Sequence, residues 1–71
     1  MRCAKELARE ILRVQDVREA TWNDKASAYD VSMKDAAFRY CKTPGLAEIV
    51  YLLCTYAWED SRAWAENILK K

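Results

Sequence analysis

The chain has 71 residues, a net charge of +1 at pH 7 and an apolar content of 52%, which limits it to one domain and argues against a disordered body. The weak charge predicts no strong attraction to nucleic acid or to an anionic membrane. Three widely spaced cysteines and no histidine match neither a disulfide framework nor a structural zinc site. We therefore expect a reducing compartment, the cytoplasm, with no metal and no cofactor.

Residues 3–18 predict a first helix, because apolar side chains recur three and four positions apart along them. Its apolar side consists of Ala4, Leu7, Ala8, Ile11, Leu12 and Val14. Charged residues fill the other side, where Glu6 with Arg9 and Glu10 with Arg13 have the i,i+3 spacing of helical ion pairs. Helix propensity falls after Val14, so we expect this helix to end near residue 18.

Residues 19–32 allow two interpretations. Ala20 and Trp22 alternate with polar neighbours, and so do Tyr29 and Val31, which is typical of a small β-hairpin. No Asn-Gly or Asp-Gly dipeptide marks a tight turn between them. A polar loop held by its aromatic residues explains the same pattern, so we predict a loop or a small β-hairpin.

A second helix is predicted over residues 33–42. Ser32 followed by Asp35 has the spacing of a capping box. The Thr-Pro-Gly sequence at 43–45 then predicts a sharp turn, because Pro is tolerated in the first turn of a helix and Gly often follows the end of one. Gly45 can either end the second helix or lie in the first turn of the third.

The third element is predicted to be one long helix over residues 46–69, because no further Pro or Gly occurs and the helical spacing continues. Asp60 and Ser61 both favour helix caps, but the apolar phase does not shift there, so we expect no more than a bend at Ser61. The apolar run over 46–58 is shorter than the roughly 20 residues of a membrane span.

The expected fold is therefore mainly α: a single domain over residues 1–71, with three helices of which the C-terminal one is long. The predicted core consists of Leu7, Ile11, Val14, Ala37, Cys41, Leu46, Ile49, Val50, Leu53, Ala57, Trp64 and Ile68.

The apolar arc of the third helix is wider than the roughly 100° that one neighbouring helix covers. Leu52 and Tyr56 lie on one shoulder of this arc, and Tyr51 and Trp58 lie on the other. The first two helices can cover both shoulders, but Tyr and Trp are also favoured at interfaces and a chain this small gains stability from a partner. We hypothesise a non-enzymatic protein-interaction module, either a homodimer or an inhibitor-like binder that occludes a larger protein.

The alternative hypothesis is a nucleic-acid-associated protein that uses a basic face of the first helix, formed by Arg2, Lys5, Arg9 and Arg13. Acidic residues interrupt this face and no aromatic residue is placed among the basic ones to stack on bases. We therefore expect a protein partner or self-association rather than nucleic acid. Without histidine, a Ser- or Cys-based triad lacks its usual base. An enzyme relying on Cys3 at the helix start is the weakest alternative.

Overall fold

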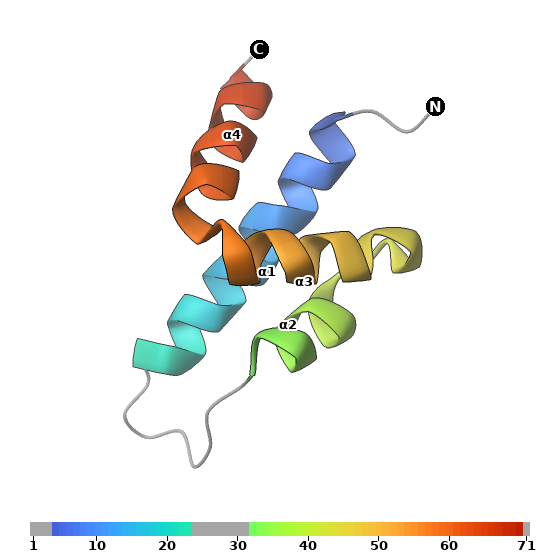
Figure 1. Ribbon diagram of the computed structural model, residues 1–71, viewed down its shortest axis with the longest axis vertical. Coiled ribbons are helices and arrows are strands. Elements are labelled where there is room, and N and C mark those ends of the chain that lie inside the picture. Colours follow the sequence, from blue (N-terminus) through green and yellow to red (C-terminus); the bar gives the residue numbers. More distant parts are fainter. Residues whose placement is uncertain (1–3, 24–31, 71) are drawn as a thin grey trace.

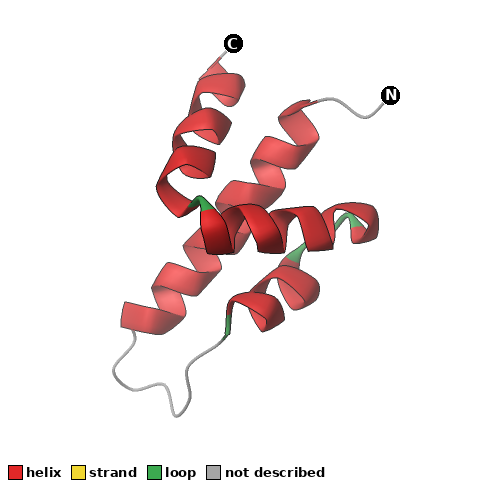
Figure 2. Cartoon of the chain, in the orientation of Figure 1, coloured by secondary structure: helices red, strands yellow, loops and turns green. Residues whose placement is uncertain are grey.

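The computed structural model describes residues 4–23 and 32–70, which form four α-helices and contain no strand (Figures 1 and 2). The helices are α1 (Ala4–Asn23), α2 (Met33–Tyr40), α3 (Ala47–Tyr56) and α4 (Trp58–Lys70), and a short 3-10 helix, η1 (Pro44–Leu46), precedes α3. The prediction of a small, mainly α-helical fold is confirmed. None of the helices within these described residues has the length and apolarity needed to cross a bilayer.

Helix α1 is the longest helix and packs against each of the other three, most extensively against α4. In Figure 1, α3 crosses in front of α1, and α4 turns back along the first half of α1. The start of α1 and the end of α4 therefore lie at the same end of the molecule.

Helix α1 continues to Asn23, past the predicted end at residue 18. The prediction of a loop or a small β-hairpin over residues 19–32 is wrong for residues 19–23, which belong to this helix. Residues 24–31 of the predicted segment lie outside the described residues. Two alternating pairs are too short to define a period. Val17 and Arg18 are half-buried, so tertiary packing supports the helix through the part of lower propensity that follows Val14.

Helix α2 starts as predicted, with Ser32 at its N-cap accepting a hydrogen bond at 3.0 Å from the backbone N–H of Asp35. It ends at Tyr40, two positions before the predicted boundary at 42, because Cys41 takes an extended backbone conformation. In the turn that follows, the Leu46 N–H donates to the Thr43 carbonyl at 2.9 Å. Gly45 therefore lies in the 3-10 turn before α3 and does not form the C-terminal cap of α2.

The prediction of one long C-terminal helix is wrong. Ala57 has φ −146° and ψ 54°, which separates α3 from α4. The break falls before the predicted bend at Ser61, which instead lies within α4. Helix α3 crosses α1 (Figure 1), so a straight continuation of α3 would carry its second half away from α1. The break lets α4 return to α1 and bury Ser61 and Ala65.

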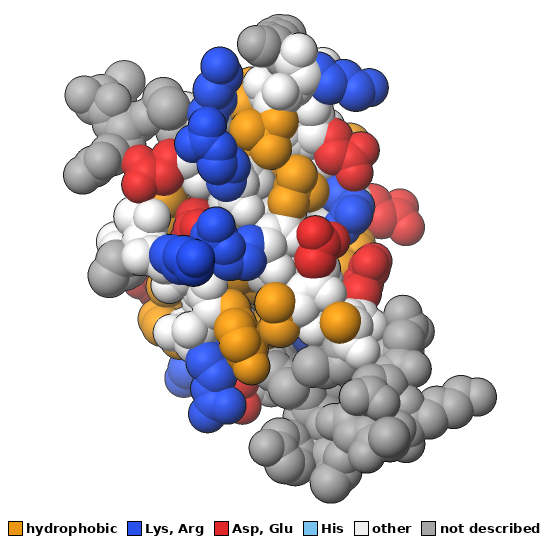
Figure 3. Space-filling model, turned by 180° about the vertical axis from the view of Figure 1, so that it is seen from behind, with side chains coloured by type: hydrophobic (Ala, Val, Ile, Leu, Met, Phe, Trp, Pro, Cys, Tyr) orange, Lys and Arg blue, Asp and Glu red, His pale blue; other side chains and the backbone are white. Residues whose placement is uncertain are grey.

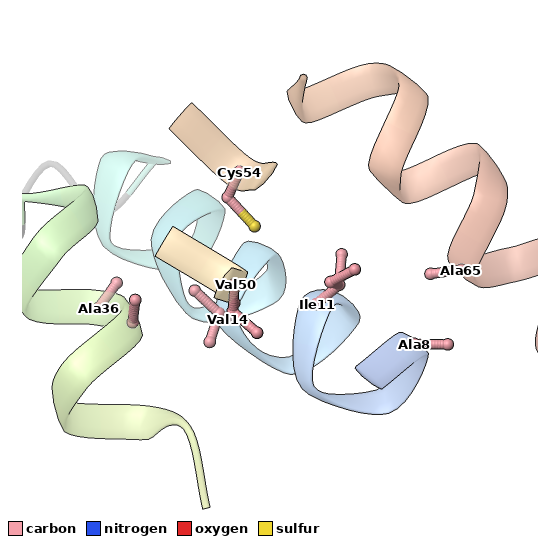
Figure 4. Packing of buried hydrophobic residues seen from close by; sticks show 8 residues of the cluster. Ala8, Ile11, Val14, Ala36, Val50, Cys54 and Ala65 are labelled. Carbon is pink, nitrogen blue, oxygen red and sulfur yellow. The ribbon is translucent and has the colours of Figure 1, made fainter. Parts of the chain in front are cut away.

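The core is built mainly from small residues on facing helices (Figure 4). Its buried cluster consists of Ala8, Ile11, Val14, Ala36, Ala37, Val50, Cys54 and Ala65. Small side chains let the helices approach closely, and the larger Leu7, Leu46, Leu53 and Ile68 pack around this centre.

The core prediction is confirmed for Ile11, Val14, Ala37 and Val50, which are fully buried. It is wrong for Ile49 and Trp64, which are 46% and 38% exposed. The remaining predicted residues Leu7, Cys41, Leu46, Leu53, Ala57 and Ile68 are half-buried.

Candidate functional site

The outward side of α3 carries three exposed apolar residues, which we call the outer α3 face: Ile49, Leu52 and Tyr56. They are 46%, 43% and 82% exposed, respectively. Their i, i+3 and i+7 spacing aligns them along one side of the helix. The opposite side of α3 holds its buried residues Val50 and Cys54, so α3 is apolar on both its inner and its outer side.

Leu52 and Tyr56, the first predicted shoulder, are brought together on this outer face. Tyr51 and Trp58, the second predicted shoulder, are instead half-buried and pack against the core. The Tyr51 ring also lies 6.3 Å from the ring of Phe38 on α2, measured between centroids. Only the first shoulder, Leu52 and Tyr56, is therefore exposed to solvent. Ile49, which was predicted to be a core residue, is exposed beside it.

A second feature adjoins the outer α3 face where α3 and α4 diverge. This junction cleft has a volume of about 380 Å³ and almost entirely apolar walls, and it is open to solvent. Its lining residues are Leu7, Leu53, Ala57, Asp60, Ser61 and Trp64. Leu53 is one helical turn from Ile49, so the cleft and the outer α3 face form neighbouring parts of one apolar surface.

The cleft exists because of the helix break. The Ala57 N–H still donates to the Leu53 carbonyl at 2.9 Å, and the Ser61 N–H donates to the Ala57 carbonyl at 2.8 Å. The change of direction is therefore confined to Ala57, which itself lines the cleft. Leu7 contributes the part of the lining that comes from α1.

Gln15 of α1 fixes the junction from the inside. Its side chain is fully buried, and its Nε2 donates to the Trp58 carbonyl at 3.0 Å and to the Ser61 Oγ at 3.2 Å. It also contacts the Cys54 Sγ at 3.7 Å. A buried amide needs such partners, so these contacts tie the end of α3 and the first turn of α4 to one position on α1.

Arg62 continues this network at the surface between α4 and α1. Its Nη1 donates to the Gln15 Oε1 at 3.3 Å and to the Asp16 Oδ1 at 3.4 Å, and its Nε donates to the Glu66 Oε1 at 3.1 Å. The guanidinium is therefore held on the α1 side of α4 by two carboxylates and an amide.

Glu10 fixes the segment that leads into α3. The sequence placed it on the charged outer side of the first helix, but it is only 3% exposed. Its carboxylate accepts hydrogen bonds from the Cys41 thiol at 2.7 Å and from the Thr43 N–H at 3.0 Å, and it is paired with Arg13. These contacts satisfy a buried charge and anchor the turn between α2 and η1 to α1.

The two cysteines that the structure describes, Cys41 and Cys54, are free thiols. Burial raises the pKa of the Cys54 thiol above its ordinary value, and the hydrogen bond from the Gln15 amide opposes this shift. Cys54 is therefore kept protonated as part of the core. Cys3, on which the enzymatic alternative relies, lies outside the described residues.

The predicted basic face of the first helix is interrupted. Lys5 and Arg9 are exposed, whereas Arg13 is half-buried and paired with Glu10; Arg2 lies outside the described residues. Figure 3 shows basic side chains gathered on the side opposite to the view of Figure 1, with acidic side chains bordering them. Binding of nucleic acid through this face stays a prediction.

No family model matches the chain, and searches of curated proteins and of solved structures found no match either. Among residues 4–23 and 32–70, no three His, Cys, Asp or Glu side chains are grouped so that they could hold a metal ion. The candidate site is thus defined by its geometry: an exposed apolar helix face next to an apolar cleft.

Proposed function

We propose that this chain is a small, non-enzymatic protein-interaction module that contacts its partner through the outer α3 face. The observation that carries this proposal is the exposure of Ile49, Leu52 and Tyr56 on one side of a helix whose other side is already buried in the core. Tyr, and apolar residues clustered on a solvent-exposed face, are typical of protein interfaces. The module acts by covering the surface of a larger protein, as an inhibitor does, or by pairing with a second copy.

The cytoplasm is the compartment that we propose for this module. Its support is the odd number of cysteines in the chain and the free thiols of Cys41 and Cys54, since disulfides persist mainly in oxidising compartments.

The proposal is tested with the double variant Leu52→Glu/Tyr56→Glu, which places two carboxylates on the outer α3 face. Sedimentation velocity across a dilution series separates self-association from a monomer, and affinity capture followed by titration of the purified partner measures binding to another protein. We expect the double variant to lose whichever association the parent protein shows by at least about a hundredfold in Kd. The nearby variant Thr55→Glu, on the polar side of α3, serves as the matched control.

Unchanged association of the double variant, with a circular dichroism spectrum equal to that of the parent protein, would exclude the outer α3 face as the interface.

A further inference from the structure

The chain segment that carries the outer α3 face and most of the junction cleft has charges of one sign. Residues 43–61, which include all of α3 and the first turn of α4, contain Glu48, Glu59 and Asp60 but no Lys or Arg. Of these three carboxylates, Asp60 lines the cleft itself. All three residues are exposed, so the apolar surface is bordered by acidic groups that face solvent.

The described basic residues that are closest in sequence to the cleft residues point elsewhere. Arg62 follows directly after this segment, but its guanidinium is engaged by Asp16 and Glu66 on the α1 side of α4. On α1, Lys5 and Arg9 are each two positions from the cleft residue Leu7, and a separation of two residues turns a side chain by about 200° around a helix. The negative charge of the cleft edge is therefore not neutralised by these neighbours.

Resting on the proposed function, we infer that the junction cleft receives the apolar anchor of an amphipathic helix in a partner protein, and that Lys or Arg residues flank this anchor. The cleft volume of about 380 Å³ accommodates one large apolar side chain. An amphipathic helix presents further apolar residues at i+4 and i+7, which reach Ile49 and the outer α3 face. Basic flanks of that helix lie opposite Asp60 and complement its charge.

The same charge pattern argues against a second copy as the occupant. Two copies pairing through α3 bring their Glu48, Glu59 and Asp60 carboxylates into one interface, and α3 supplies no base to compensate. Juxtaposed like charges disfavour such a pairing. A basic partner helix meets the same apolar surface without this penalty.

The test uses the full 71-residue protein and a displayed library of helical peptides. Each peptide has Leu at i, i+4 and i+7, and its flanking positions are randomised among Lys, Arg, Glu, Asp, Gln and Ser. We expect the selected peptides to carry a net positive flank. For a selected peptide, replacement of its basic flanks by Glu should weaken binding about tenfold or more at moderate salt.

Charge reversal at two neighbouring residues locates the contact on the protein. Asp60→Lys alters the cleft edge, whereas Glu59→Lys makes the same charge change at an exposed residue that does not line the cleft. We expect Asp60→Lys to weaken binding of a selected basic peptide about tenfold and Glu59→Lys about twofold. Circular dichroism and urea unfolding of both variants establish that they remain folded.

The outcomes separate this inference from the proposed function. Selected peptides with neutral or acidic flanks, or equal effects of the two reversals, would overturn the basic partner while leaving the outer α3 face as an interaction surface. A parent homodimer that Asp60→Lys strengthens and that excludes the peptides would identify a second copy as the occupant and also overturn the inference. Failure to enrich any peptide over the Leu52→Glu/Tyr56→Glu variant would overturn the basic partner helix, whereas the proposed function fails when this double variant associates as strongly as the parent protein.

Discussion

Gln15 connects α1 with the α3–α4 junction through atoms that solvent does not reach. Its amide nitrogen bonds the Trp58 carbonyl and the Ser61 hydroxyl, and its oxygen accepts from Arg62. The same position in the helix repeat is occupied by Ala8 and Ile11, seven and four residues earlier, and both of these are fully buried. A polar residue within an apolar stripe is thus the sequence signal for this network, because a buried amide must find partners.

We expect Gln15→Leu to lower the free energy of unfolding by about 2 kcal/mol, because the Trp58 carbonyl and the Ser61 hydroxyl lose a buried donor while the volume stays similar. Urea unfolding followed by circular dichroism measures this change. A double-mutant cycle with Ser61→Ala should give a coupling of about 0.5–1 kcal/mol between the two side chains. Strict additivity of the two substitutions would show that their hydrogen bond does not contribute to stability.

The two described thiols differ in their surroundings, and their reactivity should differ as well. Cys54 is 3% exposed and its pKa is raised by burial, so the folded protein holds less thiolate at this position than an ordinary cysteine does at the same pH. The thiolate is the reactive form. We expect iodoacetamide at mildly alkaline pH to modify Cys41, which is half-buried, at least about tenfold faster than Cys54.

Peptide mapping by mass spectrometry gives the two rates separately. In urea both rates should converge, because unfolding removes the burial that raises the pKa of Cys54. Equal rates in the folded protein would mean that Cys54 is reached by solvent.

At the scale of elements, the break at Ala57 decides how α3 and α4 lie on α1. A residue outside the helical conformation loses little when glycine replaces alanine, whereas an exposed position inside a helix loses about 1 kcal/mol. We therefore expect Ala57→Gly to lower the free energy of unfolding by less than about 0.5 kcal/mol, and Ala63→Gly, at an exposed site within α4, by about 1 kcal/mol. Urea unfolding of both variants compares them directly. A cost at Ala57 equal to that at Ala63 would indicate one continuous helix.

The sequence could predict that this part of the chain is helical, but it could not predict where the helix breaks. Buried positions recur at Ala47, Val50, Cys54, Ser61 and Ala65, and this spacing of three, four, seven and four is the same as in an unbroken helix. The break depends on contacts with α1, which is distant in sequence. The helix propensity of Ala57 does not predict a break, because alanine is the best helix former.

The candidate site was also predictable only in part, because the exposure of its residues depends on contacts between helices that are distant in sequence. Periodicity placed Leu52 and Tyr56 away from the buried side of α3, and the structure exposes both. The predicted core included Ile49 and not Ala47, yet Ala47 is buried and Ile49 is exposed. Close helix packing favours the smaller side chain at a contact, and the sequence does not reveal which helices approach that closely.

At the scale of the whole molecule, α3 contributes to stability through its buried residues Ala47, Val50 and Cys54. The outer α3 face does not contribute. Helix α1 packs against the other three helices, and the polar contacts of Glu10 and Gln15 tie it to both ends of α3. The outer α3 face takes no part in these contacts. Its residues should therefore be replaceable without unfolding the protein, which is what an interaction surface requires.

Two tyrosines on α3 test whether the packed side of this helix, and not the outer α3 face, contributes to stability. Tyr56 is 82% exposed, whereas Tyr51 is half-buried and lies against Phe38. We expect Tyr56→Glu to change the free energy of unfolding by no more than about 0.5 kcal/mol, as at most surface sites. Tyr51→Glu should lower it by about 2 kcal/mol or more, because it brings a charge to a partly apolar contact and removes the ring.

Thermal unfolding of the parent protein and both variants provides the measurement, at two protein concentrations about a hundredfold apart. Since the acidic border disfavours pairing of two copies, the midpoint of the parent protein should not depend on concentration. A midpoint that rises with concentration in the parent protein and in Tyr51→Glu, but not in Tyr56→Glu, would instead show that a second copy covers the outer α3 face and contributes to stability. Equal destabilisation by the two substitutions would place both tyrosines in the core, and the outer α3 face would then no longer be available to any partner.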